Sequence, residues 1–86
     1  MRELEKQLKA LANRRRLAIL KYLRDKGEAP VAEIAEEINL SFKATSKHLG
    51  VLAARGIIDR DQRSRQMFYC LVDKQSSTVK HVLLLL

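Results

Sequence analysis

A run of basic, hydroxylic and aromatic residues begins at position 41 and has the composition that contacts with nucleic acid require. Lysine can donate to guanine O6 and N7 or to phosphate, and serine can contact a base edge or a phosphate. We expect a helix over residues 42–55, whose apolar side, Thr45, Leu49 and Leu52, faces the core. The opposite side then carries Phe42, Lys43, Ser46, Lys47 and Gly50. This small, basic face favours a helix that lies in the major groove of double-stranded DNA.

The start of this helix offers two further contacts. Ser41 is the expected N-cap, and the free backbone N–H groups at a helix N-terminus favour phosphate. Phe42 allows two interpretations: its ring could contact a thymine methyl group or a sugar, or it could pack back beside Leu40 or the third helix. We favour packing, and keep both Ser41 and Phe42 as candidate DNA contacts.

Arginines are also concentrated after this helix, around an expected hairpin tip at residues 62–65. Such a tip can reach the flanking DNA backbone or the minor groove, whose negative potential favours arginine. The candidate contacts are Arg60, Arg63 and Arg65. Because Asp59 and Asp61 are expected to pair with arginines along the strands, Arg63 and Arg65 are the stronger candidates.

The elements that must position these residues are mainly α-helical, with a small antiparallel β-hairpin. Apolar residues at helical spacing predict helices over residues 2–11, 14–26, 31–38, 42–55 and 75–86. Asn13 is the expected N-cap of the second helix, and β-branched and aromatic residues predict two strands, 57–61 and 66–71. Only residues 39–41 separate the third and fourth helices. Two helices joined by so short a turn and followed by a hairpin indicate a winged helix-turn-helix fold with a two-stranded wing.

Length and charge agree with this interpretation. The chain has 86 residues, enough for a single domain over residues 1–86 with one small core. It has 17 Lys and Arg against 10 Asp and Glu, for a formal net charge of +7. The excess is concentrated in residues 14–27 and 41–66, while residues 28–40 are net acidic. A lipid-binding helix would place its basic and bulky apolar residues on one continuous segment, so this distribution favours DNA over a membrane surface.

Several other classes find no support in the residues. Two His and one Cys are scattered, without a paired general base or a glycine-rich phosphate loop, so we do not expect an enzyme or a bound cofactor. The longest apolar runs are far short of a membrane span. The lone Cys70 cannot form an internal disulfide, and we interpret it as a packing residue of a cytoplasmic protein.

The two terminal helices are the expected dimer interface. Residues 2–11 carry leucines on one side, and residues 75–86 are apolar nearly all round, which calls for burial on more than one side. We therefore expect a homodimer. The alternative is a protein-interaction module that docks a partner through its apolar C-terminal segment.

The most specific of several ordered motifs is the spacing of Ser41, Ser46, His48, Leu49 and Leu52, followed by Gly-Ile-Ile at 56–58. Over about residues 4–72 these motifs resemble the ArsR-type winged helix-turn-helix repressors. The stretch from Leu8 to Leu20, the Ala-Glu-Ile-Ala at 32–35 and the Phe-Tyr at 68–69 add to it. The resemblance implies a homodimeric repressor of transcription that binds a palindromic operator and often releases it on binding a metal or another signal.

The metal-binding motifs of that family are missing. Where many members carry Cys-Val-Cys at the start of the third helix, this chain has Pro30-Val31-Ala32, which offers no thiolate. Residues 73–86 contain only Asp73 and His81 as potential ligands. We therefore expect no metal site, and no effector follows from the sequence.

Arg14, Arg15 and Arg16 begin the second helix, where cations oppose the helix dipole. Either the acidic third helix or DNA phosphate could compensate them. We favour an ion pair for Arg16 and a phosphate for one of the other two. His48, on the flank of the helix over residues 42–55, is expected to be a buried, hydrogen-bonded residue.

Overall fold

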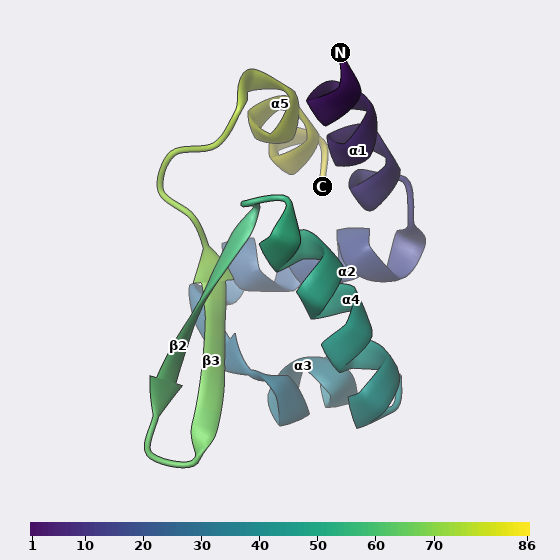
Figure 1. Ribbon diagram of the computed structural model, residues 1–86. Helices are drawn as coiled ribbons and strands as arrows, with labels where there is room; N and C mark the ends of the chain where they lie inside the picture. The colour runs from purple at the N-terminus through teal and green to yellow at the C-terminus, as the bar shows by residue number, and fades with distance from the viewer.

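Five helices surround a small antiparallel sheet in the computed structural model, which describes residues 1–86 (Figure 1). Both chain termini lie at the end of the molecule formed by α1 and α5, and the hairpin of β2 and β3 extends away from that end. The elements in chain order are α1 (Arg2–Leu11), α2 (Arg14–Lys26), β1 (Glu28–Pro30), α3 (Val31–Glu37), α4 (Phe42–Ala54), β2 (Ile58–Arg63), β3 (Gln66–Leu71) and α5 (Ser77–Leu85). The five expected helices are confirmed.

Side-chain caps fix the starts of three helices. The Oδ1 atom of Asn13 accepts hydrogen bonds from two N–H groups of α2, at 3.0 and 3.1 Å. The hydroxyl of Ser41 accepts one from the first turn of α4 at 3.1 Å, and that of Ser76 accepts one from α5 at 3.2 Å. Asn13 and Ser41 are therefore N-caps, as the sequence predicts, and each cap satisfies N–H groups that have no partner within the helix.

Some helix ends differ slightly from expectation. α3 ends at Glu37 and α4 at Ala54, each one residue early, and α5 is shorter than the expected 75–86. Beyond both α3 and α4 the next N–H group still bonds to a helical carbonyl, so the helices end gradually. None of these shifts changes which residues face the core.

The sheet has three strands, in the order β1-β3-β2, where the sequence predicted two. β1 pairs antiparallel with β3 and places Ala29, which is 1% exposed, opposite Tyr69. The strand was missed because three residues are too few to show an alternating pattern and because Pro30, which lacks an N–H donor, is atypical of a strand. The predicted two-stranded wing is confirmed as β2 and β3. The additional strand β1 brings Glu28 beside this hairpin.

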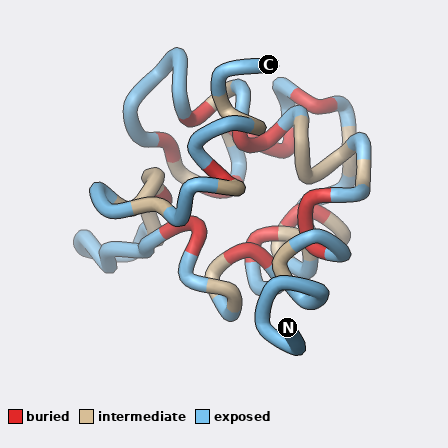
Figure 2. The backbone as a smooth tube through the Cα atoms, turned by 90° about the horizontal axis from the view of Figure 1, so that it is seen from above, coloured by how far each residue is buried: buried red, intermediate tan, exposed pale blue.

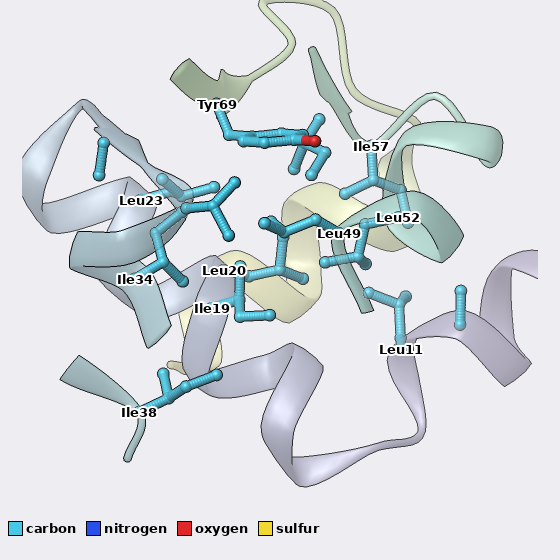
Figure 3. Packing of buried hydrophobic residues seen from close by; sticks show 14 of the residues in the cluster. Leu11, Ile19, Leu20, Leu23, Ile34, Ile38, Leu49, Leu52, Ile57 and Tyr69 are labelled. Atoms are coloured by element: carbon cyan, nitrogen blue, oxygen red, sulfur yellow. The ribbon is translucent and has the colours of Figure 1, made fainter. Parts of the chain in front are cut away.

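The core lies between α2, the inner faces of α3 and α4, and the sheet (Figure 3). Seen from above, the buried segments point inward and the outer turns of most helices are exposed (Figure 2). Leu49 and Leu52 of α4 are fully buried against this core, as the sequence predicts. The largest side chains that are under 2% exposed include Ile19, Leu20, Leu23, Ile34, Leu49, Leu52, Ile57, Ile58 and Val79.

Arginines of α2 bond to the C-terminal ends of other helices. Arg16 donates to the carbonyl oxygens of Ala10, at 2.5 Å, and Lys9, at 3.2 Å, in the last turn of α1. Arg15 donates to the carbonyl oxygen of Ile38, at 2.7 Å, just after α3. Carbonyls at helix ends lack partners within the helix and carry the negative end of its dipole, so a guanidinium stabilises them.

A third arginine of α2 does the same for α5. Arg24 donates to the carbonyl oxygens of Leu83 and Leu86, both at 2.7 Å. Carbonyls at helix ends, and not the carboxylates of α3, are therefore the partners of these three arginines. The expected ion pair between Arg16 and the third helix is wrong, because the Arg16 guanidinium bonds to carbonyl oxygens of α1 and to His48. Glu33 of the third helix accepts a hydrogen bond from Tyr22, which raises the pKa of Tyr22 to about 12.

One polar group in the core lacks a partner. The hydroxyl oxygen of Thr45 is fully buried and makes no hydrogen bond. A buried hydroxyl without a partner costs about 1–3 kcal/mol relative to one that is satisfied.

We expect Thr45→Val, which keeps the branched shape, to raise the free energy of unfolding by about 1 kcal/mol in a denaturant titration. A lower stability than the parent would contradict this, because it would mean that the hydroxyl is hydrogen-bonded in solution.

Candidate nucleic-acid interface

The exposed side of α4 is arranged as the helical period predicts. Thr45 and the two leucines that follow at helical spacing fix one side of α4 in the core. On the other side Lys43, Lys47 and Gly50 are exposed and Ser46 is half-buried. Neither lysine forms an ion pair within the chain, so both ammonium groups are available to an external anion. The structure brings these four residues together on one face.

Phe42 departs from the favoured interpretation. Its side chain is 60% exposed, so it is not packed into the core. It also lines a groove of about 210 Å³ between α3, α4 and the hairpin, together with Val31, Arg65 and Met67. The ring is therefore mostly exposed, and the favoured prediction that it packs against the protein is wrong. The groove places Phe42 and Arg65 on the same stretch of surface.

The hairpin differs from expectation at Arg63. Its guanidinium makes two contacts with the carboxylate of Glu28, one of them 3.0 Å long, and its Nε atom lies 2.8 Å from Asp61 Oδ2. The Arg63 guanidinium also lies 4.6 Å above the ring centre of Phe68. The hydrogen bond to Arg63 holds the pKa of Glu28 below its ordinary value. The expectation that pairing leaves Arg63 free is therefore wrong: Arg63 is the paired arginine.

The other two arginines of the hairpin are unpaired. Arg60 and Arg65 are exposed and form no ion pair within the chain. Arg60 borders a groove of about 300 Å³ that also includes Gly50 and Ala54 of α4. The sequence could not place Arg60 there, because its position depends on how β2 packs against α4. Arg60 and Arg65 thus extend the basic surface of α4 on its hairpin side.

His48 lies on the opposite flank of α4 and links it to α2. Its Nδ1 atom is 3.3 Å from the guanidinium of Arg16, and because arginine only donates, Nδ1 accepts. Burial lowers the pKa of His48, and the positive charges of Arg16, Arg15 and Lys47 lower it further. The prediction of a hydrogen-bonded histidine is confirmed, although the residue is half-buried.

Glu28 is the residue of this surface that sequence reasoning missed. Its contact with Arg63 joins residues 35 positions apart and depends on the pairing of β1 with β3. No local pattern signals such a contact. The negative charge of Glu28 and Asp61 neutralises the hairpin arginine that stood out in the sequence.

The residues present do not fit a metal centre of the kind that the resemblance implies. Pro30, Val31 and Ala32 at the start of α3 supply no ligand atom, and no three His, Cys, Asp or Glu side chains lie close enough together to hold a metal ion. Cys70 is half-buried on β3, where burial and the nearby carboxylates of Asp59 and Glu28 raise the pKa of its thiol. No helix is both long and apolar enough to cross a membrane.

Known proteins share both the sequence and the fold. Residues 13–59 match the family model of winged helix-turn-helix DNA-binding domains. The chain is 39% identical over 79 residues to the transcriptional activator HlyU of Vibrio cholerae, covering 92% of this chain and 69% of that protein. It is 41% identical over 66 residues to the transcriptional regulator NmtR of Mycobacterium tuberculosis, covering 77% of this chain and 54% of NmtR. It is 28% identical over 75 residues to the arsenical resistance operon repressor of Bacillus subtilis, covering 87% of this chain and 71% of the repressor.

Solved structures agree. Reduced HlyU from Vibrio cholerae superposes with a TM-score of 0.81 at 36% identity, covering 96% of this chain and 83% of that one. A homodimeric winged helix-turn-helix DNA-binding domain from Mycobacterium bovis, described as a possible ArsR-family regulator, gives 0.81 at 28% identity, covering 96% and 73%. The family match includes the turn and all of α4, which carry the surface described above. The chain belongs to the ArsR-type winged helix-turn-helix family of DNA-binding transcriptional regulators.

Proposed function

We propose that this regulator acts as a homodimer that inserts one α4 helix from each protomer into successive major grooves of a palindromic operator. The observation that carries the proposal is the two-sided character of α4: one side is fixed in the core, and the other presents unpaired lysines beside an unpaired basic hairpin. In helix-turn-helix dimers the two half-sites lie about 34–36 Å apart, which is one turn of DNA.

Each candidate residue has a role in this proposal. Lys43, Ser46 and Lys47 read base edges or contact phosphate, and the N-terminus of α4 at Ser41 faces a phosphate. Phe42 contacts a thymine methyl group or a sugar with the exposed part of its ring. Arg60 and Arg65 contact the flanking backbone or minor groove. Arg63 contacts DNA only if Glu28 releases it.

The proposed dimer interface is formed by the terminal helices, residues 2–11 and 75–86, of a single domain over residues 1–86. Leu84 and Leu85 of α5 are 83% and 84% exposed, and Leu4 and Leu8 of α1 are 40% and 47% exposed. An apolar groove of about 310 Å³ runs along this side of α1. Exposed leucines on neighbouring helices favour burial in an interface. The homodimeric relative from Mycobacterium bovis supports the same assembly.

We further propose that the dimer represses transcription in the cytoplasm, by occupying operator DNA that the transcription machinery needs. One relative is named a repressor, which supports this direction, and another is named an activator. A reporter gene placed behind the operator should therefore be more active when this chain is deleted. Lower activity after deletion would assign activation instead.

Lys47 tests whether α4 reads bases. We expect Lys47→Ala to reduce the preference for DNA from upstream of its own gene over random DNA of equal length by about 1–3 kcal/mol per half-site. Lys74→Ala is the matched control, because Lys74 is an exposed lysine in the loop between β3 and α5, outside α4 and the hairpin. Fluorescence anisotropy with both DNAs measures the preference.

Equal reductions in affinity for both DNAs would show that Lys47 touches only phosphate. If the parent chain is a monomer by light scattering and retains no DNA at low salt, the proposed function is wrong. That result would favour a protein-interaction module that docks a partner through Leu84 and Leu85.

Glu28 tests the state of the hairpin arginine. We expect Glu28→Gln to increase the affinity for DNA, because the Arg63 guanidinium no longer has its bidentate partner and can turn to a phosphate. The slope of log affinity against log salt should become steeper by about 0.9 for each additional phosphate that the protein neutralises. Asp73→Asn makes the same change in net charge at an exposed residue outside the hairpin and is the control. An affinity that matches the control would show that Asp61 and Phe68 suffice to hold Arg63.

A further inference from the structure

A small basic pocket lies between α1, α2 and α4, apart from the face of α4 and the hairpin already described. Its volume is about 260 Å³. It is lined by Lys6, Lys9, Ala10, Arg16, Val51 and Arg55. Four of these six side chains carry a positive charge and none carries a negative one, so the pocket is suited to an anion.

The positive charge of the pocket is only weakly compensated within the chain. Lys6 forms no ion pair, and Arg16 bonds to backbone carbonyls and to His48, which are uncharged partners. Lys9 is 3.7 Å from Glu5, and Arg55 is 3.7 Å from Glu3.

Both of these ion pairs are long and open to solvent. The side chains of Glu5 and Glu3 are 66% and 69% exposed, and exposed pairs of this kind contribute about 0–1 kcal/mol. An anion that accepts hydrogen bonds from several of the cations at once can replace them. A phosphate group, with several charged oxygens, has the required chemistry.

The pocket also borders the proposed DNA surface. Lys47 and Val51 of α4 and Arg55, its C-cap, are spaced four residues apart, so they form one stripe along the helix. Lys47 belongs to the exposed face, and Val51 and Arg55 line the pocket. The side chain of Arg55, at the C-terminal end of this stripe, is 25% exposed. An anionic backbone that passes along α4 would reach the pocket next.

The neighbourhood of the pocket is positive as a whole. His48, which bonds to Arg16, has its pKa lowered by burial and then by Arg16, Arg15 and Lys47. These effects all disfavour a positive charge on His48. The positive charges that line the pocket are therefore not fully neutralised within the chain and can attract an external anion.

We propose that this pocket binds a phosphate group, supplied in the DNA complex by a backbone phosphodiester that α1 and α4 contact together. That DNA supplies the phosphate group rests on the proposed function. The proposal gives α1 a second role beside the dimer interface, because Lys6 and Lys9 line the pocket. Lys9 also borders the apolar groove that contains Leu4 and Leu8. A free phosphate in the same pocket would share the chemistry, and the two arms of the test separate the sources.

The first arm measures DNA binding by the double variant Lys6→Gln, Arg55→Gln. We expect the slope of log affinity against log salt to fall by about 0.9 for each phosphate that is no longer neutralised, or about 1.8 for a dimer in which this happens once per protomer. Specific and random DNA should be weakened equally, because phosphate carries no sequence information. Lys74→Gln is the charge control, and the conservative variant Arg55→Lys should keep most of the slope.

The second arm titrates inorganic phosphate into the chain without DNA and follows backbone amide NMR signals. Saturable shifts confined to the residues of the pocket, and absent in the double variant, would support the site. If they occur while the salt slope is unchanged, the pocket takes free phosphate and the DNA source is wrong. An unchanged slope together with no saturable shifts would overturn the proposal.

Two checks keep this test independent of folding and of the proposed function. Glu3→Gln removes the competing carboxylate and should steepen the slope, which a merely misfolded variant would not do. If the parent chain binds no DNA but the pocket still titrates with phosphate, the proposed function fails and the phosphate site stands. If the parent binds DNA and both arms are negative, only the pocket proposal fails.

Discussion

The structure depends on hydrogen bonds between three arginines of α2 and the C-terminal ends of three other helices. Arg16 bonds to the last turn of α1, Arg15 to the carbonyl that follows α3, and Arg24 to the end of α5. Cations at the start of α2 oppose its own dipole, and the negative ends of α1 and α3 compensate them. Because α2 also supplies Ile19, Leu20 and Leu23 to the core, one helix fixes both the apolar and the polar contacts of its neighbours.

This arrangement links the elements that a DNA-binding dimer must hold at a fixed spacing. Arg15 holds the turn that leads into α4, while Arg16 connects the end of α1 to His48 on α4. The α1 helix of the proposed dimer interface and the proposed recognition helix α4 are therefore both held in place by arginines of α2. The hairpin is braced separately, through β1, by Glu28 and Arg63. The unpaired charges of the hairpin are those of Arg60 and Arg65, which line grooves that also include residues of α4.

Local patterns in the sequence predicted most of the helices and the face of α4. Helix caps and apolar spacing act over a few residues and need no tertiary information. The examples are the caps at Asn13 and Ser41 and the buried positions Thr45, Leu49 and Leu52. The failures involve contacts between distant residues. β1 is too short to show a period, the Glu28–Arg63 pair depends on that strand, and the partners of the α2 arginines are backbone carbonyls, which every residue carries. Charge in the sequence locates a basic region, but tertiary contacts decide which cations are free.

If two α4 helices are held at a fixed distance, they should read two symmetric half-sites of DNA. Selection of bound DNA from a random pool with the intact chain can show this symmetry. We expect an inverted repeat whose half-site centres lie about 10–10.5 base pairs, or one DNA turn, apart. Recovery of a single unsymmetrical site, or of no enriched sequence at low salt, would contradict it.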